Sequence, residues 1–302
     1  MKNLPLKVGD FVDIIAPGFR CDIKDVKSAL KRIKSWGLVP RVPKNLFGPD
    51  IICGNSDAAR FDQLKRALNS NSKFIWCVRG GYGSIRLLDG LSKMKRPKRS
   101  KVVLGYSDIT SLHAFLLRKW KWKSLHGPLL DKFGKGGLAP RDETYLKKVL
   151  FGEIKNHSYG NLKPLNALAK KAGIVRGELI GGNLTVVSSL IGLPWQFDSS
   201  GKILFFEDIG ERGYRVDRLL KYFSQVGFFK NVKAIVFGEF IEGLERNGKS
   251  LCAPVIKRFA NEIKIPVLMG LPTGHGDKQT TLPIGTKAIL KKGAKAELYV
   301  TY

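Results

Sequence analysis

The sequence predicts an α/β protein with two domains: an N-terminal doubly wound, mostly parallel sheet domain, and a strand-richer mixed α/β C-terminal domain. A chain of 302 residues with 43% hydrophobic residues is long enough to bury a core in each domain. The first half alternates short apolar runs with helical patterns, which is typical of a parallel sheet covered by helices. In the second half, strand patterns outnumber helical ones.

In the first half, the predicted strands are continuous apolar runs and the predicted helices are apolar stripes of helical spacing. The helix at 22–37 ends at a glycine, and the run at 73–83 passes into a glycine-rich turn. The predicted strands are 11–17, 38–44 (as an edge strand), 73–83 and 101–107, and the predicted helices are 22–37, 57–70, 84–91 and 108–120.

The second half contains two clear helical patterns, 215–227 and 253–263. Its predicted strands are 173–183, 202–208, 232–240, 266–272 and a hairpin over 286–300 that turns near Lys292 and Gly293. Glycines, prolines and lysines are frequent between the halves. We therefore predict domains at 1–135 and 171–302, joined by a connection at 136–170.

Lysine and arginine outnumber aspartate and glutamate by 53 to 25, a formal net charge of +28. Such a charge attracts polyanions but says nothing of fold. Two clusters, KMKRPKRSK at 93–101 and RKWKWK at 118–123, combine cations with aromatic residues. No nucleic-acid-binding motif accompanies them and the positive charge is spread over both halves. A basic solvated surface is therefore predicted, and nucleic acid is not predicted as a partner.

The amino-terminal stretch has no secretory pattern, and no apolar run approaches the roughly 20 residues that span a bilayer. The sequence thus predicts a cytoplasmic protein without membrane insertion. The four cysteines are scattered without a CxxC pair. No cluster has metal-ligand spacing, so neither a zinc site nor a disulfide framework is predicted.

The stretch GYSD, residues 105–108, lies where a predicted strand turns into a predicted helix. Such a turn can present Ser107 as a nucleophile beside helical amides that could stabilise an oxyanion. The match to G-x-S-x-G is incomplete, because Ile109 stands in place of the second glycine. The alternative is that Ser107 or Asp108 caps the helix, and this segment alone favours the cap.

A serine nucleophile needs a base, and an acid that orients the base. Among the four histidines, His275 lies between two glycines just after an apolar strand, although an exposed turn histidine fits equally well. Glu207 directly follows a five-residue apolar run. The nearby acids Asp208, Glu211 and Asp217 remain alternatives on the residues alone.

The stretch RGGYG, residues 79–83, also follows an apolar strand. It lacks the spacing of the nucleotide-binding glycine motifs. Three glycines in four residues indicate a backbone that approaches a ligand closely.

Several blocks, in order along nearly the whole chain, resemble the LD-carboxypeptidases, or murein tetrapeptide carboxypeptidases, with the related microcin C immunity hydrolases. The blocks are IIAPG, with Gly18 in place of the usual serine, GNSDAARFDQLKRAL, FIWCVRGGYGSIRLL, VVLGYSDITSLH, LHGPLL, GELIGGNLTVVSSLIGLPW, ILFFEDIGERGYRVDRLL and GLPTGHGDKQTTLPIG.

The resemblance implies a serine peptidase with Ser107, His275 and Glu207 as its triad, formed where the two domains meet. It also implies an oxyanion hole from the amides of Gly81 and Asp108. Arg79, Tyr106 and Asn183 become candidates for contact with substrate or for shaping the site.

The implied reaction releases the terminal D-alanine of murein tetrapeptides in peptidoglycan recycling. The implied protein is a homodimer that requires no metal or cofactor. The resemblance leaves a microcin-type hydrolase of peptidyl or aminoacyl nucleotide conjugates as an alternative. A non-catalytic polyanion-binding protein on a hydrolase-like scaffold is a further alternative.

Overall fold

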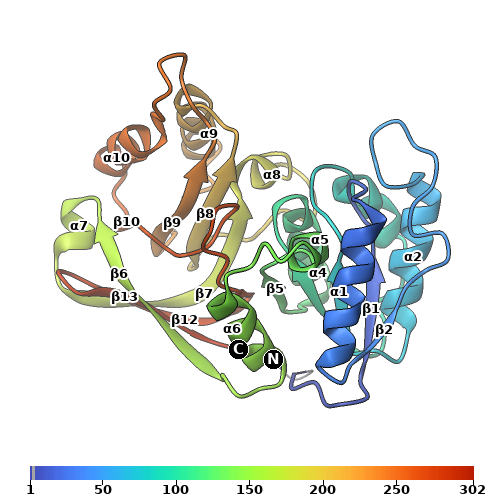
Figure 1. The fold of residues 1–302 in the computed structure, drawn as a ribbon. Helices are drawn as coiled ribbons and strands as arrows, with labels where there is room; N and C mark the ends of the chain where they lie inside the picture. The colour runs from blue at the N-terminus through green and yellow to red at the C-terminus, as the bar shows by residue number, and fades with distance from the viewer. Residues whose placement is uncertain (2–3) are drawn as a thin grey trace. The chain divides into compact units, whose positions relative to one another are not determined.

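The computed structural model describes residue 1 and residues 4–302. The chain divides into two compact units, Met1–Ile154 and Lys155–Tyr302. Figure 1 traces unit 1 from blue to green and unit 2 from light green to red. The predicted α/β fold class, a parallel-rich domain followed by a strand-richer mixed domain, is confirmed.

Unit 1 contains five parallel strands in the order β5-β4-β3-β1-β2. The predicted edge strand is β2, which ends this order. The strands are β1 (Phe11–Ile15), β2 (Val39–Arg41), β3 (Phe74–Cys77), β4 (Val102–Gly105) and β5 (Ser124–His126). The helices are α1 (Ile23–Ser35), α2 (Asp57–Asn69), η1 (Ser84–Leu87), α3 (Leu88–Ser92), η2 (Ser107–Ile109), α4 (Thr110–Trp120), α5 (Leu130–Gly134) and α6 (Pro140–Leu150).

The sequence explains these elements directly. Every residue of β3 and of β4 is buried, as expected of parallel strands covered on both faces. Helix α1 begins where the Asp22 carboxylate accepts a hydrogen bond from the Lys24 amide at 2.9 Å. It is followed by Gly37, whose φ of +77° favours glycine. Helix α1 packs beside β2, and α2 packs beside β1 (Figure 1).

Unit 2 is built on a closed sheet of seven strands in the order β10-β6-β13-β12-β7-β8-β9, in which β9 and β10 also pair. The strands β7, β8, β9 and β10 are parallel neighbours, and the other pairings are antiparallel. The strands are β6 (Asn156–Pro164), β7 (Gly173–Asn183), β8 (Ile203–Ile209), β9 (Ala234–Ile241), β10 (Val267–Met269), β11 (Leu282–Ile284), β12 (Thr286–Lys292) and β13 (Ala296–Thr301). The helices are α7 (Ala167–Lys170), α8 (Leu184–Ser188), α9 (Gly213–Gln225) and α10 (Cys252–Glu262).

Aromatic side chains on the parallel strands of this sheet pack in the interior of unit 2. The first six residues of β8 are buried. The Phe206 ring centroid on β8 lies 5.8 Å from that of Phe223 on α9 and 6.1 Å from that of Phe237 on β9. Helices α9 and α10 pack against each other (Figure 1). The predicted hairpin over 286–300 is confirmed as β12 and β13, which pair antiparallel.

Residues 136–170, where the sequence predicts a connection, contain α6 in unit 1 and β6 and α7 in unit 2. Strand β6 pairs with both β13 and β10 and so closes the seven-stranded sheet. Across the described residues, no helix combines the length and the apolar character needed to cross a bilayer.

His113 of α4 is fully buried, and its Nε2 lies 2.9 Å from the Gly105 carbonyl oxygen at the end of β4. Burial lowers the pKa of this imidazole to about 4. The histidine therefore stays neutral and donates its Nε2 proton to the strand.

Because the unfolded chain binds this proton near pH 6.5 and the folded chain only near pH 4, acid favours unfolding. We expect His113 to lower the free energy of unfolding by about 2 kcal/mol between pH 7 and pH 5. Urea unfolding at both pH values checks this. The control is His113→Gln, which keeps a neutral donor and should lose that part of the pH dependence. Equal pH dependence in both proteins would contradict the assignment.

Candidate active site

The turn after β4 presents Ser107 in a strained backbone conformation. Tyr106 is extended, Ser107 has a φ of +62°, and the 3-10 helix η2 begins at Ser107 itself. A left-handed residue other than glycine is uncommon and is concentrated at functional sites. A Cβ added at Gly105 would lie 2.8 Å from the Ile109 side chain, so this glycine makes room for the isoleucine that replaces the usual second glycine.

The capping interpretation of this turn is wrong. Neither η2 nor α4 has a side chain bonded to its first amides. The buried Asp108 carboxylate instead accepts a hydrogen bond at 2.8 Å from the Ser84 amide, at the start of η1. Burial raises the pKa of Asp108, and hydrogen bonding from Ser84 opposes the shift. Asp108 thus joins the serine turn to the end of the glycine-rich loop.

The RGGYG loop lies directly against Ser107. A Cβ added at Gly80 would lie 2.9 Å from the Ser107 Cβ and 3.1 Å from its Oγ. Gly81 has a φ of +84° and packs on the ring of Phe19, and Gly83 has a φ of +133°. The loop therefore requires glycines because of close packing and left-handed backbone.

Two residues outside the loop constrain its position, Arg60 by hydrogen bonds and Gly18 by close packing. The fully buried Arg60 of α2 donates to the Gly83 carbonyl at 2.9 Å and also to the Pro17 carbonyl. A Cβ at Gly18 would overlap the Gly80 carbonyl oxygen and lie 3.0 Å from the Asp108 carboxylate. Glycine at position 18, where the family resemblance leads one to expect serine, is thus required by this packing.

Arg79 and Tyr106 have different surroundings. The Arg79 guanidinium lies 3.6 Å from the Asp131 carboxylate and remains partly exposed. Tyr106 is buried, with its ring centroid 5.9 Å from that of His126. Of the other histidines, His126 is itself buried, and His157 is half-buried against Tyr159 on β6 rather than solvated.

In unit 2, the predicted acid and base meet. His275 Nδ1 lies 2.7 Å from Glu207 Oε2, and the Glu207 side chain on β8 is fully buried. The His275 side chain retains 11% exposure. A buried carboxylate on Nδ1 fixes the imidazole tautomer and stabilises a positive charge on the ring.

The alternative acids have other partners. Asp208 accepts hydrogen bonds from Asn183 Nδ2 at 2.8 Å and from the Thr185 amide at 2.9 Å. Burial, and then the charge of Glu207, raise the pKa of Asp208 to about 6. Glu211 lies 3.6 Å from Arg215, whereas Asp217 pairs with Arg258 at 2.5 Å rather than with a neighbour on its own helix.

Asn183, a candidate for substrate contact, uses its side chain within unit 2. Its amide nitrogen donates to Asp208, and its oxygen accepts from the Val186 amide at 3.0 Å and caps α8. Asp208 and Asn183 together fix the end of β7 beside the strand that carries Glu207.

The sequence reasoning missed Glu239 on β9. Its carboxylate accepts a hydrogen bond from the Gly276 amide at 3.1 Å, and a Cβ at Gly274 would lie 2.8 Å from the Glu239 Cβ. Glu239 therefore bonds to Gly276 and packs closely on Gly274, the two glycines that flank His275. A signal was present, because AIVFGEF, like KILFFED, is a buried run that leads to a glutamate.

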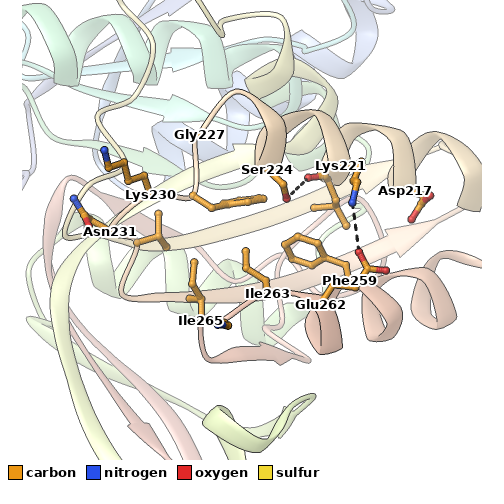
Figure 2. A pocket seen from close by; sticks show the side chains of 14 residues that line it. Asp217, Lys221, Ser224, Gly227, Lys230, Asn231, Phe259, Glu262, Ile263 and Ile265 are labelled. Atoms are coloured by element: carbon orange, nitrogen blue, oxygen red, sulfur yellow. Dashed lines mark hydrogen bonds and ion pairs between the residues drawn. The ribbon is translucent and has the colours of Figure 1, made fainter.

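A pocket of about 640 Å³ in unit 2 lies elsewhere, between α9, α10 and the loop at 227–232. Figure 2 shows Phe259 and Ile265 on its wall, with Lys221 and Glu262 joined at 3.9 Å. Its lining includes neither Glu207 nor His275. Among the described residues, no group of three or more His, Cys, Asp or Glu side chains could hold a metal ion.

Comparison with known proteins gives the class of the chain. A putative carboxypeptidase of Rickettsia conorii is 39% identical over 269 residues, which are 87% of this chain and 82% of that protein. The crystal structure of muramoyltetrapeptide carboxypeptidase from Oxalobacter formigenes matches with a TM-score of 0.85 and 31% identity, covering 97% of this chain and 99% of that one. These similarities identify the chain as a carboxypeptidase.

Residues 12–127 match the LD-carboxypeptidase N-terminal domain, and residues 176–290 match the LD-carboxypeptidase C-terminal domain. The chain therefore belongs to the LD-carboxypeptidase family, as its sequence blocks predict. The microcin C7 self-immunity protein has the same fold, with a TM-score of 0.84 at 22% identity over 99% of this chain and 97% of that one.

The contact between Glu239 and the Gly276 amide generates a prediction. In Glu239→Ala, the Gly276 amide loses a charge-assisted acceptor worth about 1.5 kcal/mol or more, and its exchange with solvent should accelerate by about tenfold or more. Hydrogen exchange measured by NMR checks this. Glu242→Ala, three residues further along, is the matched control. Unchanged exchange at Gly276 in Glu239→Ala would contradict the role of Glu239.

Proposed function

We propose that this carboxypeptidase is a serine-type LD-carboxypeptidase with Ser107 as nucleophile, His275 as general base and Glu207 as the acid that orients it. The observation that carries the proposal is the 2.7 Å hydrogen bond between His275 Nδ1 and the buried Glu207 carboxylate. The left-handed Ser107 at the end of β4 supports it from unit 1.

In the proposed reaction, His275 Nε2 takes the proton from Ser107 Oγ as the oxygen attacks the amide carbonyl between an L-centre and a terminal D-amino acid. The carbon–nitrogen bond of the tetrahedral intermediate breaks, and His275 returns the proton to the leaving amine. Water, deprotonated by His275, then hydrolyses the acyl-enzyme and restores Ser107. Glu207 stabilises the imidazolium in both halves of the cycle.

The proposed oxyanion hole consists of the backbone amides of Gly81 and Asp108. The packing of Gly80 against Ser107 supports this, because it keeps the glycine loop within reach of the nucleophile. Asp108 adds rigidity, since its carboxylate ties the serine turn to η1. Preorganised donors of this kind are the largest single contribution in many acyl-transfer enzymes.

The proposed substrate is a murein tetrapeptide, and the released product is D-alanine in the recycling of peptidoglycan. The name of the Oxalobacter relative, a muramoyltetrapeptide carboxypeptidase, supports this substrate class. A peptide that carries several carboxylates also suits a chain with a net charge of +28. We further propose a cytoplasmic homodimer that needs no cofactor, with Arg79, Tyr106 and Asn183 shaping the site.

Incubation with purified murein tetrapeptide tests the proposal. Wild-type protein should release D-alanine, and Ser107→Ala should release at least about 10³-fold less, because it removes the nucleophile. His275→Gln and Glu207→Gln should also be strongly impaired, whereas a chelator should change nothing. Release of D-alanine by Ser107→Ala at the wild-type rate would contradict the proposed triad. Cleavage of an aminoacyl-nucleotide conjugate instead of the tetrapeptide would favour the microcin-type alternative. The shared fold with the microcin C7 self-immunity protein is the reason to test that conjugate.

The packing of Gly80 generates a second test. In Gly80→Ala, the new methyl group would press on the Ser107 side chain at 2.9 Å and displace the nucleophile. We expect kcat for D-alanine release to fall by about a hundredfold because the nucleophile is misplaced. Gly160→Ala is the matched control, since its Cβ would have no neighbour closer than 3.9 Å and should leave kcat unchanged. Equal kcat in both variants would show that the loop does not position Ser107.

A further inference from the structure

The proposed chemistry leaves the two basic clusters without a role. Residues 90–130 contain ten lysines and arginines and a single acid, Asp108, whose side chain is buried. This stretch therefore carries nine of the 28 net positive charges. Nine of its cations are exposed, and we define the basic edge by the eight other than Arg118: Lys93, Lys95, Arg96, Lys98, Arg99, Lys119, Lys121 and Lys123.

The sheet brings the two clusters together. Residues 93–101 lead into Val102 of β4, and residues 121–123 lead into Ser124 of β5. The two strands are parallel neighbours, with Leu104 beside Leu125. Both clusters thus enter at the amino ends of adjacent strands, whereas Ser107 follows the carboxyl end of β4. The basic edge and Ser107 lie at opposite ends of the same sheet.

Buried residues anchor this edge while its cations face outward. Lys101 is buried and donates to the Ser70 carbonyl at 2.7 Å. Trp120 and Trp122 are only 5% and 2% exposed and lie 5.0 Å apart between ring centroids. Within the described part of the chain, no ion pair joins any of the eight exposed cations to an acid. Their charge is uncompensated by neighbouring side chains.

We propose that the basic edge docks this protein on an anionic phospholipid surface. Six of the eight cations are lysines, which act as hydrated point charges suited to a diffuse layer of headgroups. The tryptophans are buried and give no platform on which nucleic-acid bases could stack. No large apolar side chain within 90–130 is exposed, so the protein adsorbs by charge without inserting.

Docking through this edge has a directional consequence. Because Ser107 lies at the other end of β4, the adsorbed protein holds that end of unit 1 away from the lipid. The serine turn of unit 1 then stays clear of the lipid while the protein is held at the membrane surface. This proposal is independent of the triad and concerns a surface that the chemistry does not use.

Sedimentation with vesicles tests the proposal. Wild-type protein should bind phosphatidylcholine vesicles that contain about one-third phosphatidylglycerol, should not bind pure phosphatidylcholine, and should dissociate at high salt. Each charge near the surface contributes about fivefold to partitioning, so K95Q/R96Q/K98Q and K119Q/K121Q/K123Q should each weaken it by about a hundredfold. Circular dichroism and carboxypeptidase activity should match wild type in both.

The matched control is K287Q/K291Q/K295Q, which removes three exposed lysines from the β12–β13 hairpin of unit 2 and should change partitioning less than about threefold. Equal weakening in this control would show that only net charge matters, and would overturn the basic edge as the docking site. Binding of duplex DNA that is lost in the two edge variants, without vesicle binding, would identify nucleic acid as the partner and overturn the lipid assignment.

Discussion

Carboxylates within or shortly after strands organise both units. The three buried ones, Asp108, Glu207 and Asp208, must find hydrogen-bond donors because water is removed from them. In unit 1, Asp108 takes the Ser84 amide and so ties the serine turn to the glycine loop. In unit 2, three carboxylates accept hydrogen bonds: Glu207 from His275, Asp208 from Asn183, and Glu239 from the Gly276 amide. A buried acid is costly unless a definite partner bonds to it. His275, the partner of Glu207, is also the general base of the proposed chemistry.

Much of this arrangement could be predicted from sequence, because it depends on residues that are neighbours along the chain. Continuous apolar runs predicted β3, β4 and β8, since strands covered on both faces admit few polar residues. A glutamate directly after such a run is unusual, which makes Glu207 a candidate. The residues alone did not choose between Glu207 and its neighbours; that choice came from resemblance, and the hydrogen bond to His275 now gives it a geometric basis.

The remaining features depend on contacts distant in sequence. Arg60 lies within an ordinary helical pattern, yet it is fully buried and holds the Pro17 and Gly83 carbonyls, 43 and 23 residues away. The need for glycine at position 18 arises from the Gly80 carbonyl in another loop. The segment around Ser107 by itself favours a helix cap, because residue propensities report only that a helix begins there. The strained φ of this turn is imposed by contacts with its surroundings.

The closure of the seven-stranded sheet by β6 bears on how this chain can be divided for study. Strand β6 precedes residue 171, where the sequence suggested that the second domain begins, and it covers β13 on one side and β10 on the other. A fragment starting at residue 171 would leave both of those strands with bare edges, which invite pairing between molecules. A fragment starting at Lys155 keeps the sheet whole, so it is the one suited to expression as an isolated unit.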